Sequence, residues 1–233
     1  MKKLLFLLIS LVFVSVINAQ TLEEIVKKYT EAMKLDQLAK VQTIKITGKM
    51  SGMGMELPIT MYMKNPNKIK SVTNFGGQDM VSVYDGEKGY MINPMQGPDP
   101  VELTGDQLKQ VQNNNAFTDQ MVGYYKQGIL SLEGSEDVNG KPAFKLKANI
   151  EGGKPVYLSI DKDSYLLVKT SSTVNQAGQE MVVDSFLSDY FDNQGVMLPK
   201  KTTASSGGME MMVLTFDKIE VNVPIDDSVF KVK

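Results

Sequence analysis

The stretch Met53–Lys64, MGMELPITMYMK, alternates between apolar and mostly more polar residues. Its six odd positions carry methionine, leucine or isoleucine, and its even positions carry Gly, Glu, Pro, Thr, Tyr and Lys. Successive side chains of a β-strand point to opposite faces, so this period of two predicts a strand with one apolar face. Such alternation is typical of an antiparallel sheet that is covered on one side only.

The same period extends in both directions from this stretch. Apolar residues alternate with polar ones around Ile44–Met50, Phe144–Ile150 and Val156–Ile160. Short turn motifs separate these runs, as in a meander of hairpins: Asn65-Pro66-Asn67, Gly76-Gly77, Asp85-Gly86, Asn139-Gly140, Gly152-Gly153 and Gly207-Gly208. We therefore expect most of the chain to form one antiparallel sheet.

A few segments have helical spacing instead. Thr21 and Glu24 have the spacing of a capping box, and apolar residues follow it at intervals of three and four. A second box, Thr104 with Gln107, predicts another helix, and the segment 117–125 predicts a short third one. Each of these helices has one apolar face, so each must lie against another layer.

These elements together predict an α+β fold. The economical arrangement is a large curved antiparallel sheet, an open half-barrel, with the few helices covering its concave apolar face. Such an arrangement can leave an apolar cavity between the two layers.

The N-terminus predicts secretion. Lys2 and Lys3 precede the apolar run Leu4–Val16, and Ala19 ends a plausible cleavage site. Residues 1–19 are therefore expected to be a signal peptide, since the apolar run is shorter than the roughly 20 residues of a spanning helix. Residues 20–233 then form a single domain, expected to be a soluble, periplasmic monomer. No cysteine follows the cleavage site, which excludes a bacterial acylated lipoprotein.

Charge argues against a nucleic-acid partner. The formal net charge of the chain is −2, and removal of Lys2 and Lys3 makes it −4. Lysines and acids are scattered along the sequence, whereas binding to phosphates needs a concentrated basic face.

Composition also excludes most kinds of catalysis. The chain has no Cys, His or Trp, and no Arg either, so it can form neither a Ser-His nor a Cys-His pair. No motif singles out a Ser-Lys pair. The neighbouring carboxylates Asp161 and Asp163 fit a hairpin turn better than a metal or glycosidase site. We expect no enzyme activity, no catalytic or metal-binding residue and no cofactor.

The sixteen methionines are unusual, and three interpretations stay open. The three are filler of an irregular core, the adaptable lining of a lipid cavity, and soft thioether ligands of Cu(I). The third interpretation rests on the clusters Met53-Gly-Met55, Met61-Tyr-Met63 and Met209-Glu-Met211-Met212, because residues two apart on a strand share a face.

The order of motifs resembles the LolA-like periplasmic lipoprotein-carrier family over nearly all of residues 20–233. After the amphipathic first helix, the resemblance is carried by these motifs: Lys64-Asn-Pro66-Asn-Lys68, Tyr84-Asp-Gly86, Tyr90, Pro94, Asn139-Gly140, Phe144-Lys-Leu146, Val156-Tyr-Leu158-Ser-Ile160-Asp161, Asp189-Tyr-Phe191, Gly195-Val-Met-Leu198-Pro199 and Ile225–Phe230. It implies a half-barrel whose concave side is lidded by helices and accepts acyl chains. Family carriers use an arginine in the cavity to hold the lid, and this chain has none. The resemblance therefore implies the fold and the cavity but not that switch.

We expect the protein to bind the acyl chain of a lipid or lipoprotein. The expected cavity wall is Ile44, Ile46, Met53, Met55, Leu57, Ile59, Met61, Met63, Val81, Val83, Phe144, Leu146, Met211 and Val213. The expected lid residues are Leu22, Ile25, Val26, Tyr29, Met33, Leu108, Val111, Phe117 and Met121. Two alternatives remain: a periplasmic Cu(I)-binding protein, and a module that senses envelope state through a membrane-protein partner.

Overall fold

The computed structural model describes residues 20–52, 54–117, 119–176 and 178–232. The expected signal peptide, residues 1–19, and Met53 lie outside this part. Within it, thirteen strands form one sheet: β1 (Thr43–Gly52), β2 (Met55–Lys64), β3 (Lys68–Phe75), β4 (Gln78–Tyr84), β5 (Gly89–Ile92), β6 (Val101–Leu103), β7 (Leu130–Val138), β8 (Lys141–Ala148), β9 (Val156–Asp161), β10 (Leu167–Gln176), β11 (Gln179–Asn193), β12 (Val196–Ser206) and β13 (Met209–Val221).

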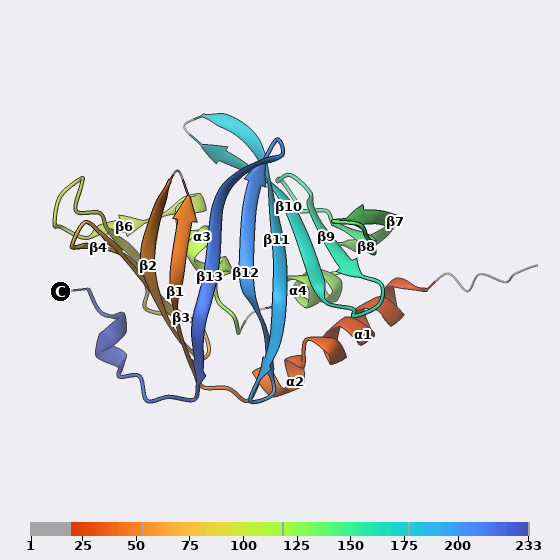
Figure 1. Ribbon diagram of the computed structural model, residues 1–233, viewed down its shortest axis with the longest axis horizontal. Coiled ribbons are helices and arrows are strands. Elements are labelled where there is room, and N and C mark those ends of the chain that lie inside the picture. Colours follow the sequence, from red (N-terminus) through yellow and green to blue (C-terminus); the bar gives the residue numbers. More distant parts are fainter. Residues whose placement is uncertain (1–19, 53, 118, 177, 233) are drawn as a thin grey trace, which may run out of the picture.

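The sheet is open and wholly antiparallel. Its order is β6-β5-β4-β3-β2-β1-β13-β12-β11-β10-β9-β8-β7, so the first and last strands pair in the middle, and β6 and β7 are the two edges. The helices are short: α1 (Leu22–Ala32), α2 (Leu35–Leu38), α3 (Gly105–Asn113), α4 (Gln120–Lys126) and the 3-10 turn η1 (Asp227–Phe230). In Figure 1, α3 and α4 lie behind the sheet, and α1 and α2 run along its lower right. This architecture confirms the predicted fold.

The helix boundaries follow from their caps. The amide of Glu24 donates to Thr21 Oγ1 at 3.2 Å, and the amide of Thr21 donates to Glu24 Oε2 at 3.0 Å, which confirms the first capping box. The prediction of a second capping box is wrong, because the Thr104 side chain makes no hydrogen bond that caps α3. Gly105 begins α3 with a left-handed φ of 56°, so the first turn is irregular. Asp119 caps α4, and Phe117 therefore precedes that helix.

Two apolar clusters fill most of the space between sheet and helices. One lies under α1 and α4 against β7, β8 and β9, and its buried members are Ile25, Val26, Tyr29, Met121, Leu130, Phe144, Leu146, Ala148, Leu158 and Ile160. The other lies around α2 and the central strands, and its buried members are Leu38, Val41, Ile44, Ile46, Met63, Ile69, Tyr84, Val196, Ile219 and Val221. The faces that they fill define the concave side of the sheet.

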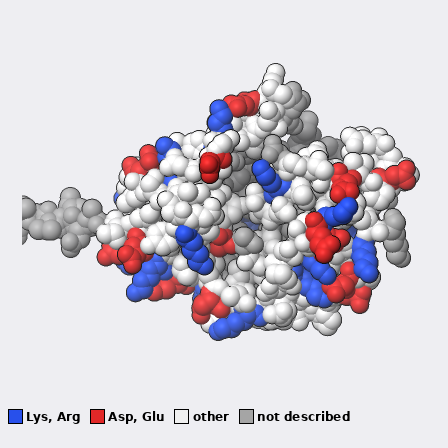
Figure 2. All heavy atoms as spheres, turned by 180° about the vertical axis from the view of Figure 1, so that it is seen from behind, with Lys and Arg blue, Asp and Glu red and all other residues white. Residues whose placement is uncertain are grey.

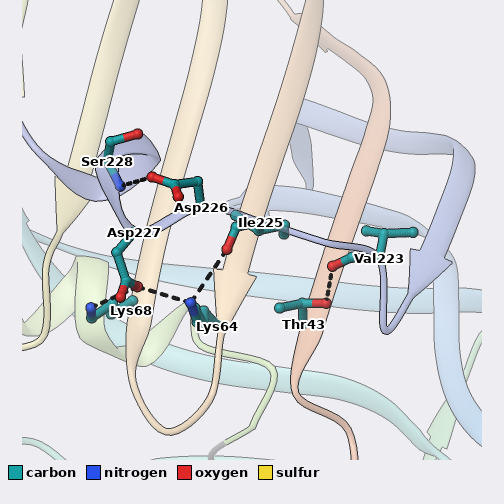
Figure 3. A network of polar contacts seen from close by, with 8 residues as sticks. All are labelled: Thr43, Lys64, Lys68, Val223, Ile225, Asp226, Asp227 and Ser228. Carbon is teal, nitrogen blue, oxygen red and sulfur yellow. Dashed lines mark hydrogen bonds and ion pairs between the residues drawn. The ribbon is translucent and has the colours of Figure 1, made fainter.

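The C-terminal segment covers part of the convex side. Lys64 and Lys68 bind the carboxylate of Asp227 at 2.9 and 3.0 Å, and Lys64 also donates to the carbonyl of Ile225 (Figure 3). Lys70 donates to the carbonyl of Val229 at 3.0 Å. These three lysines project from the face of β2 and β3 opposite to Met63 and Ile69 by strand alternation. The segment therefore makes both faces of β2–β4 partly buried.

Gly48 is required where β1 meets β13. The register shifts between Thr47 and Gly48, and a Cβ on Gly48 would lie 2.1 Å from the carbonyl oxygen of Thr215. We expect Gly48→Ala to lower the free energy of unfolding by about 1–3 kcal/mol or more, since backbone atoms must move apart. Gly123→Ala is the matched control. It lies inside α4 with nothing within 4 Å of the added Cβ, and should stabilise the protein by up to about 1 kcal/mol.

Urea denaturation followed by circular dichroism measures both changes. Equal transition midpoints for Gly48→Ala and the unmodified protein would contradict the close approach of β1 and β13.

Candidate apolar binding cavity

A cavity of about 560 Å³ lies on the concave side, over β1–β5 and β11–β13. Its most buried apolar wall residues are Ile46, Ile59 and Met63, with 3–8% of their surfaces exposed. Residues 113–116, at the end of α3 and in its connector to α4, cover one side. Its wall also includes Met50, Met61, Ser71, Thr73, Met80, Ser82, Met91, Leu187, Leu198, Thr202, Met212, Leu214, Phe216 and Ile219.

The register explains why these side chains meet. Met61 pairs with Ile46 on one side and with Ser71 on the other, and the same row continues through Ser82 to Met91. Paired residues of antiparallel neighbours point to the same face. A row that crosses five strands therefore places all of its side chains on one wall of the cavity.

The wall is suited to an apolar ligand. None of the residues that line the cavity is charged, and the polar side chains among them are hydroxyls and amides, such as Ser71, Thr73 and Thr202. Asn115 is buried, donates to the carbonyl of Pro66 at 3.0 Å and accepts from the amide of Phe117. These bonds hold the covering connector in place and satisfy its buried polar group.

Two smaller hollows adjoin the cavity where it meets solvent. One, of about 210 Å³, shares Met80 with the cavity and contains Phe75 and Met95. The other, of about 180 Å³, shares Met50 and Met212 with the cavity, and we call it the rim hollow. Phe75, Met55 and Met95 are 37%, 46% and 78% exposed, so the mouth is bordered by accessible apolar side chains.

Part of the expected wall lies at this cavity. Ile46, Ile59, Met61 and Met63 line it. Val81 borders it as well, but it alternates with Met80 and Ser82, so its side chain belongs to the other face of β4. Met55 and Leu57 line both smaller hollows instead, and Met211 lines the rim hollow. Met53 lies outside the described residues.

Three expected wall residues lie in the packed clusters. Ile44 is fully buried against the cluster around α2, and Phe144 and Leu146 lie in the cluster under α1 and α4. They do face the concave side, but helices fill the space above them. Strand alternation gives the face of a residue and not whether that face is covered by protein or left open.

Val83 and Val213 face the convex side, contrary to expectation. Val83 pairs with Lys70, whose ammonium binds the C-terminal segment, and it is 1% exposed. Because that segment covers the convex side of β4, an apolar residue is favoured on either face there. Val213 alternates with Met212 and Leu214, both of which line the cavity.

The sequence analysis missed the concave residues of β13 for a local reason. Met212, Leu214 and Phe216 line the cavity, but further along the strand Ile219 and Val221 face inward. The register with β1 shifts at this point, so the inward face changes from even to odd numbers. On β4, Val81 and Val83 are more apolar than Ser82, so the prediction chose their face as the cavity wall instead of the face of Met80 and Ser82. Met50, which shares the parity of Ile46, could have been included.

The expected lid residues divide between the two clusters. Ile25, Val26, Tyr29 and Met121 are buried in the filled cluster, and Leu22 and Met33 pack against it. Leu108, Val111 and Phe117 pack against the other cluster, which adjoins the cavity. The α3 side therefore covers the cavity, whereas α1 covers the filled half of the sheet.

One polar contact ties α1 to the start of α4. The hydroxyl of Tyr29, which is 2% exposed, donates to Asp119 Oδ2 at 2.5 Å. Asp119 Oδ1 accepts from the amide of Val122 at 2.8 Å and so caps α4. Tyr190, on β11, donates to the carbonyl of Leu167 at 2.8 Å.

The buried tyrosines predict a loss of stability in alkali. Burial raises the pKa of Tyr29 well above 10.0, with a contribution from Asp119, and burial also raises the pKa of Tyr190. Above about pH 10 the hydroxyl of an unfolded tyrosine loses its proton, whereas the folded protein still keeps it. The free energy of unfolding is therefore unaffected by these groups below about pH 10, and above it falls by about 1.4 kcal/mol per pH unit for each tyrosine.

Denaturation between about pH 8 and pH 11 tests this slope. Tyr29→Phe should make the decline shallower, and an unchanged slope in that variant would contradict the assignment to Tyr29.

A different hollow, of about 420 Å³, lies on the convex side of β10–β12. Lys141, Asp161 and Lys201 line it, together with Phe186 and Thr203. The Asp161 carboxylate accepts from the amides of Asp163 and Ser164, which confirms that the Asp161–Asp163 segment is a turn. Charged side chains of both signs make this hollow unsuited to a hydrocarbon chain.

Positive and negative side chains lie next to one another on one face of the molecule. Figure 2 shows lysines and acidic residues interspersed over the face opposite to that of Figure 1, without a continuous basic patch. Among the described residues, no helix is long and apolar enough to cross a membrane, and no cluster of three or more acidic side chains could hold a metal ion.

Several solved structures have a similar fold. A DUF1329 family protein from Desulfovibrio piger has a TM-score of 0.60 at 14% identity, with 89% of this chain and 97% of that chain covered. A LolA superfamily protein from Nitrosomonas europaea has a TM-score of 0.56 at 12% identity, covering 92% and 99%. A domain named for outer membrane lipoprotein sorting, from Vibrio parahaemolyticus, has a TM-score of 0.58 at 10% identity, covering 87% and 97%.

The chain has a LolA-like fold. No family model matches the sequence, and no curated protein matches it either. The identities of 10–14% show likeness of fold alone. The chain has no arginine, unlike the family pattern expected from the sequence. In this structure a hydrogen bond from Tyr29 to Asp119 connects helix α1 to the start of α4.

Proposed function

We propose that this protein is a periplasmic carrier that holds an acyl chain of a lipid or lipoprotein in the concave cavity. The observation that supports it best is an uncharged cavity of about 560 Å³ beside a half of the sheet where a buried apolar cluster packs against α1 and α4. Ligand cavities commonly measure about 300–1,000 Å³. Each buried methylene of the ligand contributes about 0.8 kcal/mol, so a chain supplies the driving force.

The proposed binding wall consists of Ile46, Ile59, Met61 and Met63, together with the wall residues of β4, β5 and β11–β13. The connector 113–116 and α3 form the cover in this proposal. The same proposal includes a periplasmic location, a single domain formed by residues 20–233, and a monomeric protein. An envelope membrane protein is the expected partner that delivers or receives the ligand.

Mass spectrometry of solvent extracts tests the proposal. Protein purified under native conditions should carry lipid, and the delipidated protein should bind a fluorescent fatty acid. A protein that yields no lipid and binds no such probe has another function.

Ser82 indicates that the ligand carries a hydrogen-bond acceptor. Its Oγ is buried in the cavity wall and makes no hydrogen bond to any described residue. Its strand neighbours Ser71 and Met91 line the same wall. A buried hydroxyl without a partner is costly, and an acceptor on the ligand removes this cost. The ligand is therefore an acyl chain whose carboxyl or ester carbonyl accepts from Ser82.

Ser82→Ala tests this assignment. It should weaken fatty-acid binding about three- to tenfold, the equivalent of one hydrogen bond, without loss of stability. Binding of an alkane of equal length is the control, since it has no acceptor and should be unchanged. Equal effects on both ligands would remove Ser82 from ligand recognition.

A further inference from the structure

Four methionines converge on the rim hollow. Met50 comes from β1, Met55 from β2, and Met211 and Met212 from β13. Ser51, Gly52 and Leu57 complete the lining. The hollow lies at the edge of the cavity, with a volume of about 180 Å³.

Gly52 creates the space between these thioethers. Met55 pairs with Gly52 across β1 and β2. On the other side, a Cβ on Gly52 would lie 2.6 Å from the carbonyl oxygen of Met211 and 3.5 Å from the Cα of Met212. Neighbouring strands are about 4.8 Å apart. The backbones of Met55 and Met212 are therefore about two strand spacings apart, and Gly52 between them has no side chain. Flexible thioether side chains can therefore meet above Gly52, and Met50 borders the same gap.

Packing does not explain methionine at positions 55 and 211. Met55 is 46% exposed and Met211 is 38% exposed, so neither fills an interior gap. The register between Ala204 and Ser205 of β12 shifts opposite Met211, which is the extra residue of a bulge. Such a bulge redirects a side chain that regular alternation would point away. Met211 thereby reaches the hollow together with Met212.

We propose that the rim hollow is a binding site for a soft monovalent cation, Cu(I) or its analogue Ag(I), with thioether sulfurs of Met50, Met55, Met211 and Met212 as ligands. Thioethers select Cu(I), whereas carboxylates and carbonyls suit hard cations. Ser51 is the one polar side chain that lines the hollow, so Ca²⁺, Mg²⁺ and Zn²⁺ find no charged ligand there. Neutral ligands also leave the ion's charge uncompensated, which favours a monovalent ion.

Anaerobic titration of the purified protein with Cu(I) against a chromogenic chelator tests the site, and Ag(I) serves as a redox-inert second probe. The double variant Met55→Leu/Met212→Leu keeps an apolar rim of similar volume but removes two sulfurs. We expect it to bind Cu(I) at least about tenfold more weakly. The Cu(I) titration needs no fatty acid, so its result is independent of the carrier proposal.

Met80→Leu/Met91→Leu is the matched control. Both residues line the cavity but not the rim hollow, and Cu(I) binding should be preserved. Thermal unfolding checks that each variant is folded. The proposal fails if the unmodified protein competes no better for Cu(I) than the Met55→Leu/Met212→Leu variant, or if both double variants lose equal affinity.

Discussion

Leu214→Glu is expected to weaken binding of a fatty-acid probe by about a hundredfold while the protein stays folded. Leu214 lies on β13, pairs with Met50 and Thr202, and lines the cavity. It is only partly buried, so the carboxylate can be hydrated in the empty cavity. A bound acyl chain removes that water, at a cost of roughly 2–7 kcal/mol for a polar group left unpaired.

Leu132→Glu is the matched control for this prediction. Leu132 is 37% exposed on β7 and lies outside the cavity, so the same exchange should leave probe affinity unchanged. Fluorescence titration gives both dissociation constants, and circular dichroism shows whether each variant folds. A folded Leu214→Glu protein with unaltered affinity would move the ligand away from this cavity.

Asp119→Ala is expected to lower the free energy of unfolding by about 2–4 kcal/mol. Loss of the cap on α4 costs about 1 kcal/mol. The Tyr29 hydroxyl, which is buried under α1, also loses its acceptor, and an unsatisfied buried group costs about 1–3 kcal/mol.

Two comparisons separate these contributions in urea denaturation. Tyr29→Phe removes the bond between the helices but keeps the cap, so it should be less destabilising than Asp119→Ala. Asp99→Ala is an aspartate exchange in the exposed loop after β5, with an expected change within about 0.5 kcal/mol. Equal stability of Asp119→Ala and Asp99→Ala would show that the contact between α1 and α4 contributes nothing.

Some of the candidate site could be read from the sequence, and the success depended on local regularity. In β2, alternation continues without a shift, so Ile59, Met61 and Met63 were placed on the correct face. In β13, the register shift near Asp217 changes the phase of the alternation, and Val213 was placed on the wrong face. A bulge depends on how two strands pair, and no residue type in the shifted strand marks it unambiguously.

The sequence by itself determined the open antiparallel sheet, the capped first helix and the uncharged character of the concave side. These properties depend on the period of apolar residues and on side chains a few positions apart, which are local. Tertiary structure alone decided that helices fill the half of the sheet near Leu146 and leave the half near Met61 open, because this depends on which segments come to lie above each strand. It also brought Met55 and Met212 to either side of Gly52, since strands from opposite ends of the chain pair in the middle of the sheet.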